Sequence, residues 1–189
     1  MDRLKETIVS KGKVISESVL KVDSFLNHQI DCDLLDEAGE HFFTYFTDRL
    51  VDRIMTVESS GIAVATACAR YFKTPVVFAK KQKPGTMTGD ALTTQVHSFT
   101  KNTDYTLTLS KEFIQKGEHI LIVDDFLARG NAASGLADLV ETAGAAVAGV
   151  GIVIEKGFQP GRSILENRGY DVYSLAVVES LADNRVIFQ

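Results

Sequence analysis

Two adjacent carboxylates follow a continuous apolar run of the chain. Residues 120–133 read ILIVDDFLARGNAA, so Asp124 and Asp125 come directly after four apolar residues and shortly before a loop of small residues. Carboxylates at the end of a buried strand can accept hydrogen bonds from sugar hydroxyls or hold water on a metal ion. The loop 128–132 leads into a helix, whose free N–H groups and dipole attract phosphate, and Gly130 allows a close backbone approach. The segment predicts a site for a sugar phosphate, the alternative being a capped helix beside surface acids.

Alternating strands and helices must position these residues. Apolar residues three and four positions apart predict an amphipathic helix over 34–50, and continuous apolar runs predict buried strands. The predicted strands are 53–59, 76–81, 119–125, 147–155 and 172–178, and the predicted helices are 2–11, 34–50, 62–72, 132–143 and 160–168. We also expect extended chain over 14–23, a mobile loop over 82–94, and a hairpin of 96–100 with 105–110. This order is typical of an α/β fold with a mostly parallel sheet flanked by helices, in which ligands bind beyond the carboxyl ends of the strands.

Composition places the chain among soluble proteins of ordinary size. Its 189 residues are 45% hydrophobic and 24% charged, which predicts a single globular domain over 1–189. The net charge of −5 and the scattered basic residues disfavour nucleic acid as a partner. Cys32 and Cys68 stand alone, which suits a reducing compartment. With neither a signal peptide nor an apolar span in the sequence, we expect a cytoplasmic protein without membrane contacts. The four histidines have no metal-binding or catalytic-triad spacing, so no protein-bound metal site is predicted.

Four segments taken together resemble the type I phosphoribosyltransferases, and at several points the bacterial members that use xanthine. They are LKVDSFLNHQID (20–31), VESSGIA (57–63), VDDFLARGNAA (123–133) and IEKGFQPGR (154–162). They match in order and spacing over nearly the whole chain, which is far more specific than any one motif. The resemblance implies the type I phosphoribosyltransferase fold, a mobile flap loop, and a small hood over a purine site. That hood would be formed by about residues 1–35 and the C-terminal segment.

The resemblance assigns roles to individual residues. Asp124 and Asp125 would be catalytic, holding the ribose hydroxyls of phosphoribosyl diphosphate (PRPP). Lys156 would bind the 6-oxo group of the purine, and Asn27 the 2-oxo group that adenine lacks. The remaining PRPP-binding candidates are Ala128, Arg129, Gly130, Asn131, Ala132, Ser59, Ser60 and Lys81, and the remaining purine-binding candidates are Leu20 and Phe158. Without the resemblance, Lys156 would be a solvated strand end, Asn27 a turn residue, and Ser59 or Ser60 a helix cap.

The phosphate-binding loop departs from the family pattern. Relatives carry threonines and paired glycines there, whereas this chain has Arg129, Gly130, Asn131 and Ala132. Backbone amides could still hold a 5′-phosphate, with Asn131 or Arg129 adding a side-chain donor. Relatives that use hypoxanthine and guanine place an aspartate at Ala128 as proton acceptor for purine N7. Alanine cannot accept a proton, so either a bound water serves or xanthine reacts already deprotonated.

The implied reaction transfers the phosphoribosyl group of PRPP to N9 of xanthine, in a homodimer with Mg²⁺ carried on the diphosphate. Transfer to guanine, hypoxanthine or adenine is an alternative that differs only in the purine pocket. A PRPP-binding transcriptional regulator is a further alternative, although such relatives carry an added DNA-binding module that is not seen in this sequence. A flavodoxin-like mononucleotide-binding domain would lack the paired acids before the phosphate loop.

Overall fold

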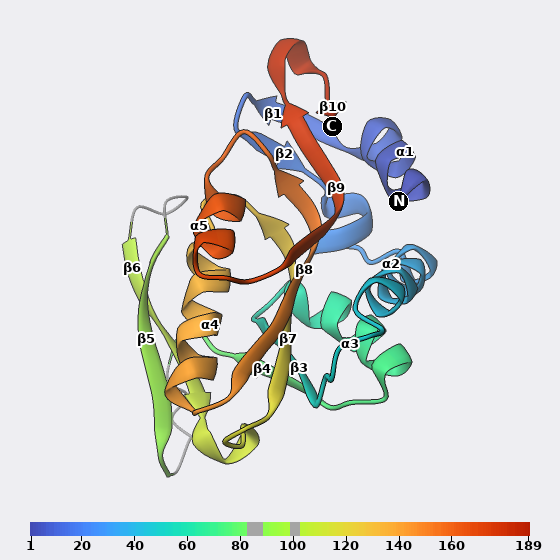
Figure 1. Ribbon diagram of the computed structural model, residues 1–189. Helices are drawn as coiled ribbons and strands as arrows, with labels where there is room; N and C mark the ends of the chain where they lie inside the picture. Colours follow the sequence, from blue (N-terminus) through green and yellow to red (C-terminus); the bar gives the residue numbers. More distant parts are fainter. Residues whose placement is uncertain (83–88, 99–102) are drawn as a thin grey trace.

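A six-stranded sheet forms the centre of the molecule (Figure 1). The structure is a computed structural model that describes residues 1–82, 89–98 and 103–189. The strand order is β10–β9–β8–β7–β3–β4, parallel throughout except that β10 runs antiparallel to β9. The strands are β3 (Arg53–Val57), β4 (Val76–Ala79), β7 (His119–Leu127), β8 (Ala146–Lys156), β9 (Val172–Ser180) and β10 (Ile187–Phe188). The predicted mostly parallel sheet is therefore confirmed.

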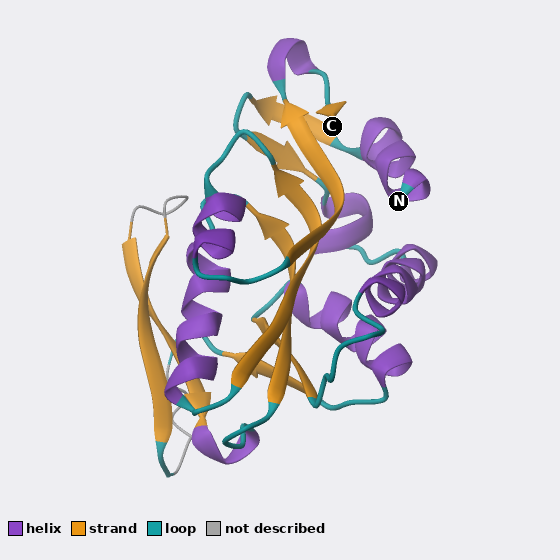
Figure 2. Cartoon of the chain, viewed as in Figure 1, coloured by secondary structure: helices purple, strands orange, loops and turns teal. Residues whose placement is uncertain are grey.

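Helices cover both faces of this sheet (Figure 2). One face packs against α2 (Cys32–Tyr45) and α3 (Gly61–Phe72), and the other against α4 (Asn131–Thr142) and α5 (Gly161–Asn167). Because apolar layers lie on both sides, the central strands are buried along nearly their whole length, as their continuous apolar sequences predict. Two glycines of β8 admit aromatic rings from the α2 side, since a β-carbon on Gly149 would lie only 2.4 Å from the ring of Phe46.

Helix α2 is shorter than predicted. Asp31 caps its start by accepting the N–H of Leu34 at 3.1 Å, but the helix ends at Tyr45 rather than at Leu50. The chain leaves the helix where the Phe46 ring enters the core, and Arg49 then binds the carbonyl of Ala148 at 2.6 Å. Leu50 is consequently 62% exposed, so its predicted place on the apolar face of the helix is wrong.

A two-stranded hairpin packs against the outer side of α4 (Figure 1). It consists of β5 (Ala91–Ser98) and β6 (Thr103–Ser110), followed by the helical turn Lys111–Phe113. The hairpin was predicted, but β5 begins at Ala91, inside the segment predicted as a loop. The strand extends this far because Leu92 and Val96 lie on the same face of it and are both buried. A β-carbon on Gly135 of α4 would stand 2.5 Å from the Val96 side chain, so glycine permits this packing. Residues 83–88 of the predicted mobile loop, with Lys83, lie outside the described residues.

The N-terminal segment folds beside the C-terminus (Figure 1). It contains α1 (Asp2–Lys11), the hairpin of β1 (Lys13–Ser16) with β2 (Val19–Lys21), and a short π-helix (Asp23–Asn27). The amino group of Met1 donates to the carbonyl of Leu175 at 3.0 Å, and the helical turn Ala182–Asn184 lies against β1. The predicted extended stretch over 14–23 is a hairpin. No helix within the described residues is long and apolar enough to cross a membrane.

Candidate functional site

The paired acids lie inside β7, two residues before the strand ends at Leu127. Asp124 is only 5% exposed, and its Oδ1 accepts the N–H of Asp125 at 3.0 Å. Burial, followed by the neighbouring charge of Asp125, raises the pKa of Asp124 well above its ordinary value. Hydrogen-bond donors and positive charge would stabilise the ionised form of Asp124, and sugar hydroxyls and cationic groups supply them.

A close approach of α3 backs the acid pair. A β-carbon on Gly61, the first residue of α3, would stand 2.1 Å from Oγ1 of Thr56 and 2.8 Å from Oδ1 of Asp124. Only glycine allows the helix to start there. The Thr56 hydroxyl is fully buried and has no hydrogen-bond partner in the structure. Sequence reasoning missed Thr56, and the available signal was a polar residue within the apolar strand RIMTV.

The segment 58–61 and Lys81 meet at the carboxyl ends of β3 and β4. Oε1 of Glu58 accepts the backbone N–H of Lys81 at 2.7 Å, which ties the two strand ends together. Ser60 occupies the position before α3, but its side chain makes no capping bond, and Ser59 is exposed. The positive charge of Lys81 lowers the pKa of Asp124, but burial together with the charge and the side-chain hydrogen bond of Asp125 raises it more. Lys81 is therefore close enough for its charge to act on Asp124, and its role in binding the diphosphate stays a prediction.

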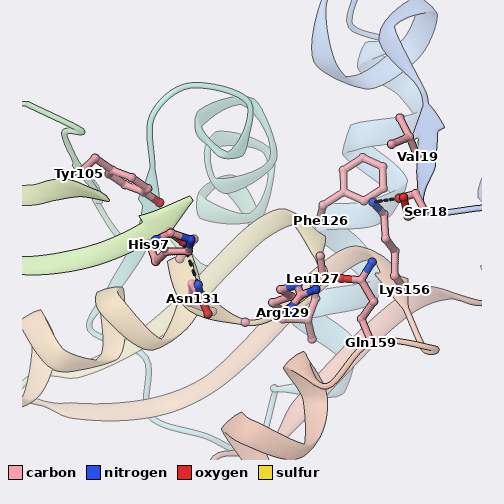
Figure 3. Close-up of a pocket in the computed structure, with 14 residues that line it drawn as sticks. Ser18, Val19, His97, Tyr105, Phe126, Leu127, Arg129, Asn131, Lys156 and Gln159 are labelled. Atoms are coloured by element: carbon pink, nitrogen blue, oxygen red, sulfur yellow. Dashed lines mark hydrogen bonds between the residues drawn. The ribbon is translucent and has the colours of Figure 1, made fainter. Parts of the chain in front are cut away.

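The phosphate loop, residues 128–132, passes from β7 into α4. Gly130 has φ +82°, a left-handed conformation that favours glycine, and its β-carbon would lie 3.0 Å from Cα of Gly161. Gly161 donates its N–H to the carbonyl of Ala128 at 3.0 Å. The Asn131 side chain donates to the carbonyl of His97 at 2.8 Å (Figure 3). Asn131 therefore ties the loop to the β5–β6 hairpin, and the predicted use of its amide as a phosphate donor stays a prediction.

A cavity of about 460 Å³ joins the phosphate loop to Lys156 (Figure 3). The Lys156 ammonium donates to the carbonyl of Ser18 at 2.7 Å and lies 5.6 Å from the centre of the Phe126 ring. Burial lowers the pKa of Lys156. The cavity is lined by Ser18, Val19, His97, Tyr105, Phe126, Leu127, Ala128, Arg129, Gly130, Asn131, Ala132, Ala133, Lys156 and Gln159.

The charge of Asp124 acts on a residue that lines this cavity. Tyr105 of β6 lines it, and burial followed by the charge of Asp124 raises the pKa of the Tyr105 phenol. The Lys81 ammonium lies 6.0 Å from the centre of the Tyr105 ring. Sequence reasoning did not single out Tyr105, because nothing in a hairpin strand indicates which residue faces a ligand.

Three predicted purine-binding residues lie outside the cavity lining. Leu20, in the middle of β2, points into the core, Asn27 is exposed at the end of the π-helix, and Phe158 is 41% exposed. Their neighbours Ser18 and Gln159 line the cavity instead. Gln159 lies inside the motif 154–162 and Ser18 two residues before the motif 20–31, which was the available sequence signal for them.

The sequence pattern of the phosphoribosyl transferase domain matches residues 23–175. The chain therefore belongs to the phosphoribosyl transferase domain family, and its mostly parallel sheet with flanking helices is the type I phosphoribosyltransferase fold.

Particular members of the family resemble the chain over its whole length. Xanthine phosphoribosyltransferase 1 of Clostridium botulinum is 54% identical, with 100% of this chain and 99% of that protein covered. Xanthine phosphoribosyltransferase of Clostridium acetobutylicum is 53% identical, with both chains covered completely. Adenine phosphoribosyltransferase of Saccharomyces cerevisiae has a similar fold, with a TM-score of 0.74 at 23% identity, covering 93% of this chain and 99% of that one.

Proposed function

We propose that this protein transfers the 5-phosphoribosyl group of PRPP to N9 of xanthine, giving xanthosine 5′-phosphate and diphosphate in purine salvage. One observation carries the proposal. A single cavity holds the phosphate loop at one side and the half-buried Lys156, above the Phe126 ring, at the other. The full-length relatives that are named xanthine phosphoribosyltransferases support xanthine as the purine.

PRPP would occupy the side of the phosphate loop. The backbone N–H groups of residues 128–132, at the start of α4, would bind the 5′-phosphate. Ser59, Ser60 and Lys81 would bind the diphosphate at the ends of β3 and β4. Asp124 and Asp125 would accept hydrogen bonds from the ribose hydroxyls and stabilise the positive charge that grows on the ribose as the anomeric bond breaks.

Magnesium would arrive with the diphosphate. Within the described residues no three His, Cys, Asp or Glu side chains form a metal-binding group. The oxygen donors that are present, the carboxylates of Asp124 and Asp125, are of the kind that Mg²⁺ prefers. They fit an ion that is held mainly by diphosphate oxygens and water. Such an ion neutralises the charge of the leaving diphosphate.

The purine would lie against Phe126 on the Lys156 side. The Lys156 ammonium can donate to the 6-oxo group and stabilise the negative charge of the attacking base. Desolvation of this ammonium strengthens that interaction, because a charge in a poorly solvated site acts over a lower dielectric. Leu20 and Asn27 would cover the base from the hood, formed by about residues 1–35 and the C-terminal segment, and Phe158 from the following turn. With Ala128 at the loop, proton loss from xanthine would go to water or precede binding.

The organisation of the protein in the cell follows from the same resemblance. We propose one phosphoribosyltransferase domain over 1–189, acting as a homodimer in the cytoplasm without nucleic acid or membrane partners. The acidic net charge of −5 and the isolated cysteines support the absence of nucleic acid and the reducing compartment. Sedimentation of the purified chain would test the dimer.

A base-competition assay tests the function. Purified protein with PRPP and Mg²⁺ is given xanthine, guanine, hypoxanthine or adenine, and nucleotide formation is followed. We expect a kcat/KM for xanthine at least about a hundredfold above that for adenine, which leaves the 2-oxo and 6-oxo contacts unmade. Preference for another purine would refute xanthine as the substrate. PRPP binding without any turnover would favour a PRPP-binding regulator.

A variant pair locates the purine. Lys156→Ala should lower kcat/KM for xanthine, whereas Lys80→Ala, which removes a lysine outside the cavity lining, should not. Equal activity of both variants would contradict the placement of the base beside Lys156.

A further inference from the structure

Glu155 is a buried charge at the end of β8, directly before Lys156. Its side chain is 3% exposed and points away from the cavity, since neighbouring strand residues face opposite sides. Arg162 donates two hydrogen bonds to the Glu155 carboxylate, from Nε to Oε1 at 2.8 Å and from Nη2 to Oε2 at 2.6 Å. The Ser174 hydroxyl donates to the same carboxylate, and Arg162 also donates to the carbonyl of Val172 at 2.9 Å. These bonds fix the guanidinium against both β8 and β9.

The two partners stand at opposite ends of the turn 156–161. Lys156 begins this turn and faces the cavity, and Gln159, which also lines the cavity, donates its N–H to the Lys156 carbonyl at 2.9 Å. Gly161 ends the turn, where its N–H binds the carbonyl of Ala128 in the phosphate loop. The Glu155–Arg162 pair therefore holds together the two ends of the turn 156–161. One end carries Lys156, and the other end contacts the phosphate loop through Gly161.

The burial of the Glu155 charge is poorly explained by stability alone. Removing a charge from water costs several kcal/mol in general, so apolar residues of similar volume often stabilise a fold as well or better. A bidentate Arg–carboxylate pair instead fixes the relative orientation and distance of the two side chains. Here it fixes the orientation of the turn 156–161, which lies between the two halves of the cavity.

We propose that Arg162, held by Glu155, is a positioning residue that sets the distance between the Lys156 ammonium and the phosphate loop. The inference rests on the proposed function, because it takes the base to lie at Lys156 and PRPP at residues 128–132. Neither Arg162 nor Glu155 lines the cavity, so the pair acts only through the turn. Loosening it should weaken both substrate sites together.

The test compares Arg162→Lys with Glu166→Gln. Lysine keeps the positive charge but loses the bidentate bond to Glu155 and the bond to the Val172 carbonyl. Glu166→Gln, the control, removes only the charge of the half-exposed Glu166, which Arg162 contacts at 3.1 Å. Three quantities are measured: the dissociation constant for Mg²⁺–PRPP without base, the KM for xanthine, and the melting temperature. We expect Arg162→Lys to raise the first two at least about tenfold, since displacements of about 1 Å have effects of this size or larger. Glu166→Gln should stay within about twofold of wild type.

Each outcome decides the proposal. A folded Arg162→Lys protein with both constants within about twofold of wild type overturns it, as does a fall in kcat alone, which would indicate only a smaller active fraction. If Arg162→Lys does not fold, Glu155→Gln keeps the shape of the carboxylate, and the same joint rise is required of it. A wild-type preference for another purine would refute the proposed substrate but not this inference, because PRPP binding is measured without base and the KM is then taken for the preferred purine.

Discussion

Asp124→Asn is expected to stabilise the fold while removing activity. Burial and the charge of Asp125 raise the pKa of Asp124 in the folded protein. The folded state therefore binds this proton more tightly than the unfolded chain, whose aspartates titrate near pH 4. With more protons bound in the folded state, stability falls as pH rises from about 4 through the raised pKa. Asparagine carries no charge, so it escapes this loss and still accepts the N–H of Asp125 through Oδ1.

The size of the gain follows from the burial of the carboxylate. Leaving a buried polar group without adequate partners costs about 1–3 kcal/mol, more when it is charged. For a chain of this length each kcal/mol moves the melting temperature by roughly 2–4 °C. We therefore expect Asp124→Asn to melt roughly 2–12 °C above wild type at about pH 8, with a smaller difference near pH 5.

Thermal melts followed by circular dichroism between about pH 5 and 9 check this expectation. Asp125→Asn is the matched control, because Asp125 is less buried than its neighbour and should gain less. Both variants should lose phosphoribosyl transfer. A melting temperature of Asp124→Asn at or below that of wild type over the whole range would refute the idea that the site is built at a cost to stability.

Three further predictions concern single side chains. Burial lowers the pKa of Lys156, so in a pH–rate profile kcat/KM for the purine should begin to decline at a pH below about 10.4, the ordinary lysine pKa. Lys156→Arg should not show this alkaline decline. Gly130 has φ +82° and packs against the backbone of α5, so Gly130→Ala should weaken PRPP binding at least about tenfold in a titration. Gly144 has φ +76° but lies outside the cavity lining, so Gly144→Ala should lower only the melting temperature. In the native protein a thiol reagent should modify the exposed Cys32 and spare Cys68, whose pKa burial raises, until the chain is unfolded.

The parallel sheet and its helices could be predicted because their patterns are local. Continuous apolar runs such as 120–123 occur where both faces of a strand are covered, and turns with Gly117 and Gly169, both at positive φ, punctuate them. The end of α2 could not be predicted, because an apolar residue at Leu50 continues the helical pattern. What ends the helix is the contact of Phe46 with Gly149, about a hundred residues away in the chain.

The candidate site divides in the same way. The acid pair and the phosphate loop are contiguous in sequence, so their chemistry was visible in one segment. The bond from Asn131 to His97 was not, because it depends on how a separate hairpin packs on α4. The lining by Ser18 and Val19 likewise depends on where the N-terminal hairpin folds back over Lys156.

The charges around the cavity suit the anionic substrates that we propose for this acidic protein. The net charge is −5, yet Lys81, Arg129 and Lys156 come from three separate strand ends to the same side of the sheet. Because the parallel strands share one carboxyl edge, residues distant in sequence contribute to one positive surface. The acids of β7 lie between the strand ends that carry Lys81 and Lys156, where they would oppose binding of a phosphate but favour a positive ribosyl group. With cations on both sides and acids in the middle, this arrangement would favour the separated charges of the proposed transition state over either neutral or uniformly anionic ligands.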